Sequence, residues 1–193
     1  MIKSLYSIYH NDSIIDQETK EFIQAWHYSK SARSLKQTDV FKLVNKTNNH
    51  LVGVAIYGQP MSRHHSKSTV ELRRLCLIND TPRNTESWFI SRTIKWLATN
   101  TDYEKVISFA DPNHGHIGTI YKASNFKYDG LEGNGNPRIV QYGEKQYHMR
   151  QFYQKKKGVY SADAVELQDA VAKGYAKILK QERKHKYIYE LNN

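Results

Sequence analysis

The chain has 193 residues, 39% of them hydrophobic, which favours one packed globular domain and excludes a wholly disordered chain. Lysine and arginine number 29 against 19 acidic residues, and the resulting net charge of +10 favours a polyanionic partner such as nucleic acid. The alternative is a basic protein whose charge binds no particular partner.

One cysteine, Cys76, is present, so an intramolecular disulfide and a zinc site with several cysteine ligands are excluded. Its neighbours indicate a strand, and we expect a buried structural thiol. The sequence has no signal-peptide pattern and no run of 18 apolar residues. We therefore expect no membrane segment and a cytoplasmic protein.

The first segments alternate between strand and helix patterns. Residues 2–9 alternate apolar and polar side chains, which indicates a strand. Ser13, with Asp16 three residues later, forms a loose capping box in front of a helix. The apolar face of that helix is expected to consist of Ile15, Phe22 and Trp26.

A hairpin and a strand–helix pair follow. Residues 39–58 hold two apolar runs around the turn-forming cluster 45–49, which indicates a hairpin. Residues 69–78 alternate as a strand does. Residues 87–100 place apolar side chains at helical spacing, so we expect a helix there.

The remaining chain continues this alternation. The sequence predicts a buried strand at 104–110, a short helix at 116–125, and strands at 138–143 and 147–154. From Ser161 a basic tail has apolar residues at helical spacing as far as Ile178, and its charged end is expected to close with a short extended segment. We expect a catalytic domain of residues 1–155 and a basic helical extension of residues 156–193, packed on or beside it.

The predicted order is β-α-β-β-β-α-β-α-β-β, which indicates an α/β (α+β) fold with a mixed central sheet flanked by helices. The stretch "SFADPNHGHIGTIYKASNF" (108–126) lies where a buried strand ends and a helix begins, a common place for ligand sites in α/β sheets. Three interpretations are open: a metal site, a catalytic centre, or a polar connecting loop. Asp111 also suits a turn cap, which is a purely structural role.

The segment "IGTIYKASNF" resembles the tyrosine-containing helix that closes the cofactor side of GNAT acyltransferases. Tyr121 stands five residues before Phe126, with Asn125 where those proteins usually have glycine. The resemblance implies that Tyr121 protonates a leaving thiolate, and a phenol with a pKa of about 10 suits that role. The alternative is a buried tyrosine that packs the helix on the sheet.

The segment "NDTPRNTESWF" (79–89) departs from the GNAT pattern, because it contains no glycine where those enzymes hold the pyrophosphate of coenzyme A with a glycine-rich loop. Polar groups near the start of the helix are still available. The candidate cofactor-binding residues are Arg83, Asn84, Thr85, Ser87 and Ser108.

Five blocks occur together and in order, and they resemble the Mom DNA-modification proteins of phage Mu and relatives, a divergent GNAT-like group that also lacks the glycine-rich loop. The blocks are "HYSKS" (27–31), "LVGVAIYGQP" (51–60), "ELRRL" (71–75), "NTESWFISRTIKWL" (84–97) and "SFADPNHGHIGTIYKASNFKYDG" (108–130). The resemblance implies conversion of adenine in double-stranded DNA to a carbamoylmethyl (acetamido) adenine at the exocyclic amine. That product protects phage DNA from restriction in the cytoplasm of the infected bacterium.

An enzyme that acts on this amine has to extrude the base, stack it and accept a proton. Besides Tyr121, the candidate catalytic residues are Asp111, Glu71, His27 and Tyr28, with Tyr28 suited to stacking. Structural alternatives exist, because Glu71 can form an ion pair with a neighbouring arginine and His27 can favour the dipole of a helix end.

Basic side chains in the loop after the hairpin, on the next strand and in the tail are candidate DNA contacts, although such runs often form only a solvated face. They are Arg63, His64, His65, Arg74, Lys155, Lys156 and Lys157. A metal needs at least three converging ligands, for which the candidates are His27, Glu71, His114 and His116.

Several alternatives stay open at this stage. The sequence does not define the donor of the transferred group, and acetyl-CoA and a related donor are both compatible with the residues. A metal ion such as iron is also compatible with them. A GNAT N-acyltransferase that uses acetyl-CoA on a protein or small-molecule amine is the main competing function. A non-catalytic DNA-binding protein is the other. A homodimer is compatible with a basic domain that acts on duplex DNA.

Overall fold

The computed structural model describes residues 2–31, 37–62, 64–133, 135 and 137–191. Its contacts divide the chain into two compact units. The first comprises Met1–Ala110, His116–Gly130 and His185–Asn193, and the second comprises Asp111–Gly115 and Leu131–Lys184. The expected division at residue 155 does not coincide with these bounds, because the last strand of the chain belongs to the sheet of the first unit.

The first unit is built on a seven-stranded sheet with the order β1-β2-β3-β4-β5-β12-β6. Its strands are β1 Tyr6–Asp12, β2 Gln37–Asn45, β3 Leu51–Gly58, β4 Thr69–Leu77, β5 Lys105–Ala110, β6 Lys127–Leu131 and β12 His185–Glu190. Its helices are α1 Ile2–Leu5, α2 Gln17–Trp26, α3 Thr85–Asn100 and α4 Thr119–Ala123. The mixed sheet flanked by helices confirms the expected fold class. None of the described helices is long and apolar enough to cross a membrane.

Strands β4 and β5 run parallel, whereas β1–β2, β2–β3, β3–β4 and β5–β12 are antiparallel pairs. The parallel ladder joins only Thr69–Glu71 to Lys105–Ile107. Beyond it the backbones of β4 and β5 are no longer paired, although the Ser108 hydroxyl still donates to the Leu72 carbonyl at 3.1 Å. The central sheet therefore opens between β4 and β5.

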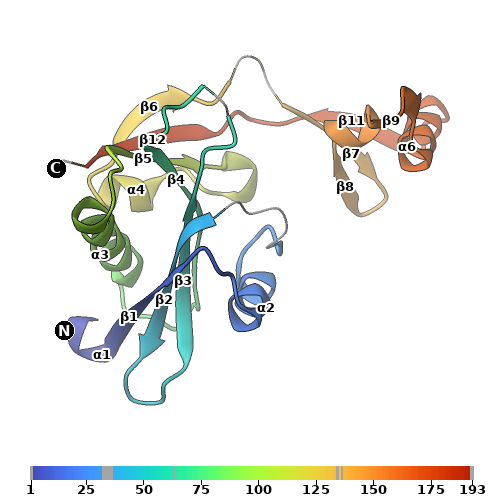
Figure 1. Ribbon diagram of the computed structural model, residues 1–193. Helices are drawn as coiled ribbons and strands as arrows, with labels where there is room; N and C mark the ends of the chain where they lie inside the picture. The colour runs from blue at the N-terminus through green and yellow to red at the C-terminus, as the bar shows by residue number, and fades with distance from the viewer. Residues whose placement is uncertain (1, 32–36, 63, 134, 136, 192–193) are drawn as a thin grey trace. The chain divides into compact units, whose positions relative to one another are not determined.

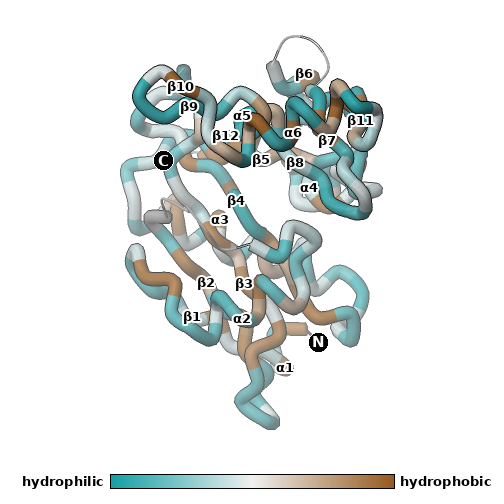
Figure 2. Tube along the Cα trace, turned by 90° about the vertical axis from the view of Figure 1, so that its right-hand side faces the viewer, coloured by the Kyte–Doolittle hydropathy of each residue, from teal (hydrophilic) through white to brown (hydrophobic). Residues whose placement is uncertain are grey.

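Alternation along β2 and β3 produces two apolar faces, as the hairpin pattern predicts. Phe41 and Tyr57 face one side and pack in the same cluster as residues of α3. Val40 and Ile56 face the other side and pack with residues of α2. Figure 1 shows the two helices on opposite sides of the sheet. In Figure 2 these strands carry hydrophobic segments, and the turn that joins them is hydrophilic.

Helix α2 begins later than the capping-box pattern predicts. Asp16 is the N-cap, and its Oδ1 accepts a hydrogen bond from the Thr19 backbone N–H at 2.9 Å. Because the helix begins at Gln17, Ile23 points into the core. Trp26, expected on the buried face, is 47% exposed, so that expectation was wrong.

Asp16 links the start of α2 to β2, because Lys42 Nζ donates to Asp16 Oδ2 at 2.5 Å. Burial alone would raise the pKa of Asp16, but hydrogen bonds from Lys42 and Thr19 lower it to about 2. The folded-state pKa lies below the unfolded one, so the stabilisation is present above about pH 4 and is lost as the pH falls toward 2. We expect Asp16→Ala to lower the free energy of unfolding by about 1 kcal/mol at neutral pH. Urea titrations of both proteins should converge below pH 3, and a difference that does not depend on pH would contradict the assignment.

The second unit contains a three-stranded sheet of order β11-β7-β8 and a two-stranded hairpin of β9 and β10. Its strands are β7 Arg138–Tyr142, β8 Lys145–His148, β9 Lys155–Lys156, β10 Val159–Tyr160 and β11 Ala176–Lys180. Its helices are the 3-10 turn η1 Pro112–His114, α5 Met149–Phe152 and α6 Ala162–Ala172. A small core joins α5 and α6 to the three-stranded sheet.

Two local predictions in the second unit were wrong. The long tail helix ends at Ala172, because Gly174 takes φ +78 and Ala176–Lys180 then pairs with β7 as a strand. The expected strand at 147–154 turns into α5 after β8, and His148 and Gln151 form the capping box of that helix. The helix start at Ser161 is confirmed, since the Ser161 Oγ accepts from the Ala164 N–H at 3.3 Å.

Candidate functional site

Tyr121 is at the centre of the candidate site in the first unit. It lies on α4, and its ring packs against Phe126 and Tyr187 with centroid distances of 5.5 and 5.3 Å. Its hydroxyl shares a hydrogen bond with the buried Ser108 side chain. The Ser108 hydroxyl is also 3.1 Å from the Leu72 carbonyl, to which it can donate. Ser108 on β5 therefore contacts both Tyr121 of α4 and the backbone of β4.

The Tyr121 phenol stays protonated over the whole physiological range. Burial and, to a smaller extent, the nearby Tyr28, Glu71 and Glu86 side chains raise the pKa of Tyr121 while the Ser108 hydroxyl lowers it, and the net pKa is about 12. A protonated phenol can donate a hydrogen bond or a proton, and its oxygen can still accept a hydrogen bond. The geometry therefore suits a proton donor to an anion that develops during a reaction.

Exposed rings lie beside this phenol. Tyr28 follows α2 and is 44% exposed. Its ring centroid is 4.3 Å from that of His27 and 5.1 Å from that of His116. Tyr28 and His116 come from segments far apart in the sequence and together form an aromatic surface, as the stacking of a base requires.

Two carboxylates complete the surroundings of Tyr121. Glu71 lies on β4 and accepts a hydrogen bond from the Met61 N–H at 3.2 Å. Glu86 lies in the first turn of α3, where loss of hydration raises its pKa and the nearby His116 opposes that shift. A carboxylate with a raised pKa is a better base near neutral pH than an ordinary one. Sequence reasoning missed Glu86, because an acid in a first turn resembles an ordinary partner of the helix dipole.

The tautomer of His27 follows from its hydrogen bonds. His27 is buried, and its Nδ1 accepts from the Ser29 backbone N–H at 3.1 Å and lies 2.8 Å from the Ser29 hydroxyl. An accepting Nδ1 places the proton of the neutral ring on Nε2. His27 therefore supports the Tyr28 ring and holds the turn after α2. Its role as a base stays a prediction.

Arg74 provides a cation near the site. It lies on β4, where its guanidinium donates to the Arg73 carbonyl at 2.7 Å and to the Ser31 carbonyl at 3.4 Å. Burial lowers the pKa of Arg74, and the nearby Tyr28 and Glu71 side chains oppose that shift. A partly buried guanidinium that remains charged can hold a phosphate.

The start of α3 is not capped by a side chain. Asn84 adopts φ 67, a left-handed conformation that asparagine tolerates better than most residues, and its side chain makes no cap hydrogen bond. The Thr85 and Ser87 hydroxyls donate to the Pro82 and Asn84 carbonyls instead of pointing outward. Arg83 is exposed. Asn84 thus provides the turn that a glycine provides in other helix starts, while the Thr85 N–H, the first of α3, donates to the Pro82 carbonyl at 3.1 Å.

Asp111 and His114 belong to the second unit. The Asp111 Oδ1 accepts from the Asn113 backbone N–H at 3.1 Å and from the Asn113 Nδ2 at 2.9 Å, so the carboxylate caps η1. Its Oδ2 lies 3.8 Å from Lys184 Nζ. The capping role is observed, and the catalytic role of Asp111 stays a prediction.

The candidate DNA contacts are dispersed over both units. Arg63 lies outside the described residues. His64 is exposed, and burial together with the nearby Lys186 lowers the pKa of His65. Lys155, Lys156 and Lys157 form the exposed β9–β10 hairpin of the second unit, where Lys155 Nζ lies 4.6 Å from the centre of the Tyr160 ring.

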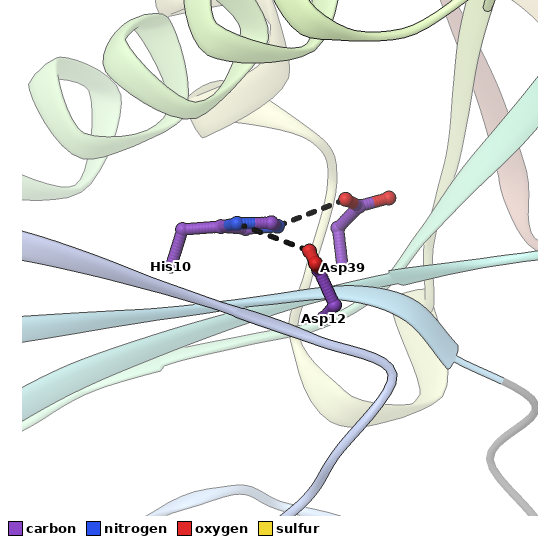
Figure 3. Close-up of side chains that lie close together, drawn as sticks. All are labelled: His10, Asp12 and Asp39. Atoms are coloured by element: carbon purple, nitrogen blue, oxygen red, sulfur yellow. Dashed lines mark hydrogen bonds and ion pairs between the residues drawn. The ribbon is translucent and has the colours of Figure 1, made fainter.

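The metal candidates from the sequence do not form one converging group within the described part of the chain. The three-residue group that does is His10, Asp12 and Asp39, at the β1–β2 edge (Figure 3). There the two carboxylates lie on opposite ring nitrogens, with His10 Nε2 2.9 Å from Asp39 and Nδ1 3.4 Å from Asp12. One ion cannot use both carboxylates together with a single nitrogen, so this arrangement is better described as a hydrogen-bonded histidine. The His10 ring also packs on Trp96 at 3.8 Å.

This fold is that of the GNAT acetyltransferases. An acetyltransferase of Bacillus subtilis in complex with CoA matches with a TM-score of 0.55 at 7% identity, covering 97% of this chain and 99% of that one. A ribosomal-protein-S18-alanine N-acetyltransferase of Escherichia coli matches with a TM-score of 0.53 at 10% identity, covering 98% and 96%. Identities this low establish the fold alone.

The chain belongs to the Mom protein family, whose sequence pattern matches residues 9–193. The methylcarbamoylase Mom of Escherichia phage Mu is 33% identical over 121 residues. This match covers 58% of the present chain and 49% of the phage protein, so the aligned part spans about half the length of that relative. The family expected from the five sequence blocks is thereby confirmed.

Proposed function

We propose that the protein modifies adenine in double-stranded DNA at the exocyclic amine, producing a carbamoylmethyl adenine. The observation that carries the proposal is the buried, protonated Tyr121 hydroxyl beside two carboxylates and an exposed aromatic surface. Membership of the Mom family and the name of the phage relative support the substrate and the group transferred. The net charge of +10 supports a nucleic-acid partner.

Each residue has a definite task in this proposal. The Tyr28 and His116 rings stack the extruded adenine. Glu86, with its raised pKa, accepts the proton that the amine loses as its nitrogen bonds to the donor carbon, and Glu71 is the alternative base. Tyr121 donates to the leaving group, and the Ser108 hydroxyl can then turn from the Leu72 carbonyl toward the phenolate. Arg74 holds a phosphate of the substrate.

The donor is expected to carry a phosphate group, as acetyl-CoA and related donors do. The start of α3 fits such a group, because no side chain caps it and Asn84 supplies the left-handed turn. The opening between β4 and β5 begins beside Ser108, the residue that bonds to Tyr121. When bound, the donor would supply the electrophilic carbon. The candidate metal ligands do not converge in the described first unit, and no step here is assigned to a metal.

Expression of the protein in a bacterium, digestion of the cellular DNA and mass spectrometry of the nucleosides test the proposal. We expect a deoxyadenosine heavier by the mass of the added group, present with the wild type and absent with an empty vector. Asp111→Asn, run beside it, tests the predicted catalytic role of that residue. Unmodified DNA from cells that contain the folded protein would contradict the proposal. Protection of that DNA from restriction enzymes is the expected biological result.

A GNAT N-acyltransferase acting on a protein or small-molecule amine is the second candidate, and the acetyltransferase fold favours it. It predicts transfer of an acetyl group to an amine without any change in DNA. Calorimetric titration with acetyl-CoA, followed by mass spectrometry of candidate amines, would separate the two functions.

A further inference from the structure

A cavity of about 410 Å³ lies in the first unit, between β1, α3 and the turn of the β2–β3 hairpin. This volume is in the range of clefts that hold one small organic group. The cavity is lined by Lys3, Tyr6, Ser7, Ile8, Tyr9, Lys46, Trp88 and Arg92. Nothing in the candidate site accounts for it.

The lining is strongly basic. Lys3, Lys46 and Arg92 come from three separate elements and converge on one cavity. None of the three forms an ion pair with a carboxylate among residues 2–31, 37–62, 64–133, 135 and 137–191. Lys42, Lys105 and Lys186, by contrast, are each paired with an acid. Three uncompensated cations at one cavity favour a phosphate-bearing ligand.

The lining is also aromatic. Tyr9 lies on the edge strand β1 and is 53% exposed. Its ring therefore contributes little to the core. Arg92 lies 5.8 Å from the centre of the Trp88 ring, which holds the guanidinium over an aromatic face. Tyr6 is buried in the wall, and its pKa is raised by burial and secondarily by Asp80. Cations beside exposed rings are the combination that proteins use for nucleotides of a strand.

The cavity is distinct from the candidate site, although both border α3. Glu86 faces His116 and the surroundings of Tyr121. Trp88 and Arg92 are two and six residues after Glu86. At 100° per residue they therefore share a flank of α3 that faces away from Glu86. Their flank faces β1, as the packing of His10 on Trp96 one turn later also indicates.

We propose that this cavity binds one nucleotide of a DNA strand, with Lys3, Lys46 and Arg92 on its phosphates and Tyr9 stacked on its base. The chemical class of ligand is a phosphorylated nucleoside. A nucleotide within a strand fits best, because the exposed Tyr9 leaves the cavity open toward solvent, where a chain can enter and leave. The proposal does not depend on the reaction at Tyr121.

Fluorescence anisotropy of labelled DNA with the full chain, between about 50 and 200 mM salt, tests this assignment. The variant combines Lys3→Gln, Lys46→Gln and Arg92→Gln. The salt slope of the binding constant is expected to fall by about 2 to 3, and the affinity at the lower salt by about tenfold or more. Tyr9→Ala is expected to weaken binding of a single strand about fivefold or more.

A matched variant with Lys20→Gln, Lys127→Gln and Lys177→Gln removes the same charge from exposed positions that do not line the cavity. It is expected to lose less affinity than the cavity variant. Equal losses in the two triple variants, with no effect of Tyr9→Ala, would overturn the proposal. Titration with free deoxyadenosine monophosphate tests whether the cavity binds a free nucleotide instead of a nucleotide within a DNA strand. If the free nucleotide binds tightly at this cavity while DNA binding is unchanged in the variants, the assignment to a strand is wrong.

Discussion

Replacement of Tyr121 by phenylalanine is expected to lower the rate of modification by about 100-fold or more, the range found when a proton donor is removed. The change keeps the ring in contact with Phe126 and Tyr187 and removes only the hydroxyl. The Ser108 hydroxyl keeps its bond to the Leu72 carbonyl, so the stability loss should be no more than about 1 kcal/mol. Modified nucleoside formed per unit of folded protein is the measurement.

The pH dependence of the modification rate is a second test of the role of Tyr121. Because the pKa of Tyr121 is raised to about 12, its phenol is protonated at every pH below about 11, and the wild-type rate should show no loss from its ionisation there. Tyr189→Phe is the matched control, since Tyr189 packs on Phe126 at 5.4 Å in the same aromatic group. It is expected to leave the rate unchanged. Full activity in Tyr121→Phe would mean that Tyr121 only packs α4 on the sheet.

Replacement of Gly118 by alanine is expected to lower the free energy of unfolding by about 2 to 5 kcal/mol, from overpacking and an unfavourable left-handed backbone. A Cβ at Gly118 would lie 2.2 Å from atoms of the Tyr187 ring, and the residue has φ +82. Tyr187 cannot move aside easily, because it is buried and its hydroxyl donates to the Ile117 carbonyl at 2.8 Å. Urea unfolding measures the loss, which is a large part of the stability of a typical domain.

Gly115→Ala separates the two causes. Gly115 has φ +76, and a Cβ added there would have no atom within 4 Å, so only the backbone cost of about 1 to 2 kcal/mol applies. Similar losses in the two variants would show that the contact with Tyr187 is unimportant. Since Gly118 is the N-cap of α4, the alanine variant should also displace Tyr121 and reduce modification by the protein that remains folded.

Elements with strong periodicity were predicted well, since the side chains that define them are close in sequence. The β2–β3 hairpin and helix α3 occur where alternation and helical spacing indicate them. The tail was predicted less well. A helical pattern continues past Gly174, but pairing of Ala176–Lys180 with β7 overrides it, and that pairing depends on residues more than 30 positions away.

The candidate site was predictable only in part. Tyr121 and Tyr28 were selected from motifs, and the structure places both in one neighbourhood. Asp111 and His114 belong to the second unit, and Asp111 caps its own turn. Glu86 and the contact of Ser108 with Tyr121 were missed, because the sequence pattern of a first helical turn or of a buried strand does not show what lies opposite it.

The sequence by itself determined the charge, the strand and helix patterns and, through five separated blocks, the family of this protein. These properties are local or additive along the chain. Only the tertiary structure decided that Glu86, His116 and Tyr28 surround Tyr121, and that three cations from distant segments line one cavity. Such groupings depend on strand order and on the faces that helices turn to the sheet, which long-range packing selects.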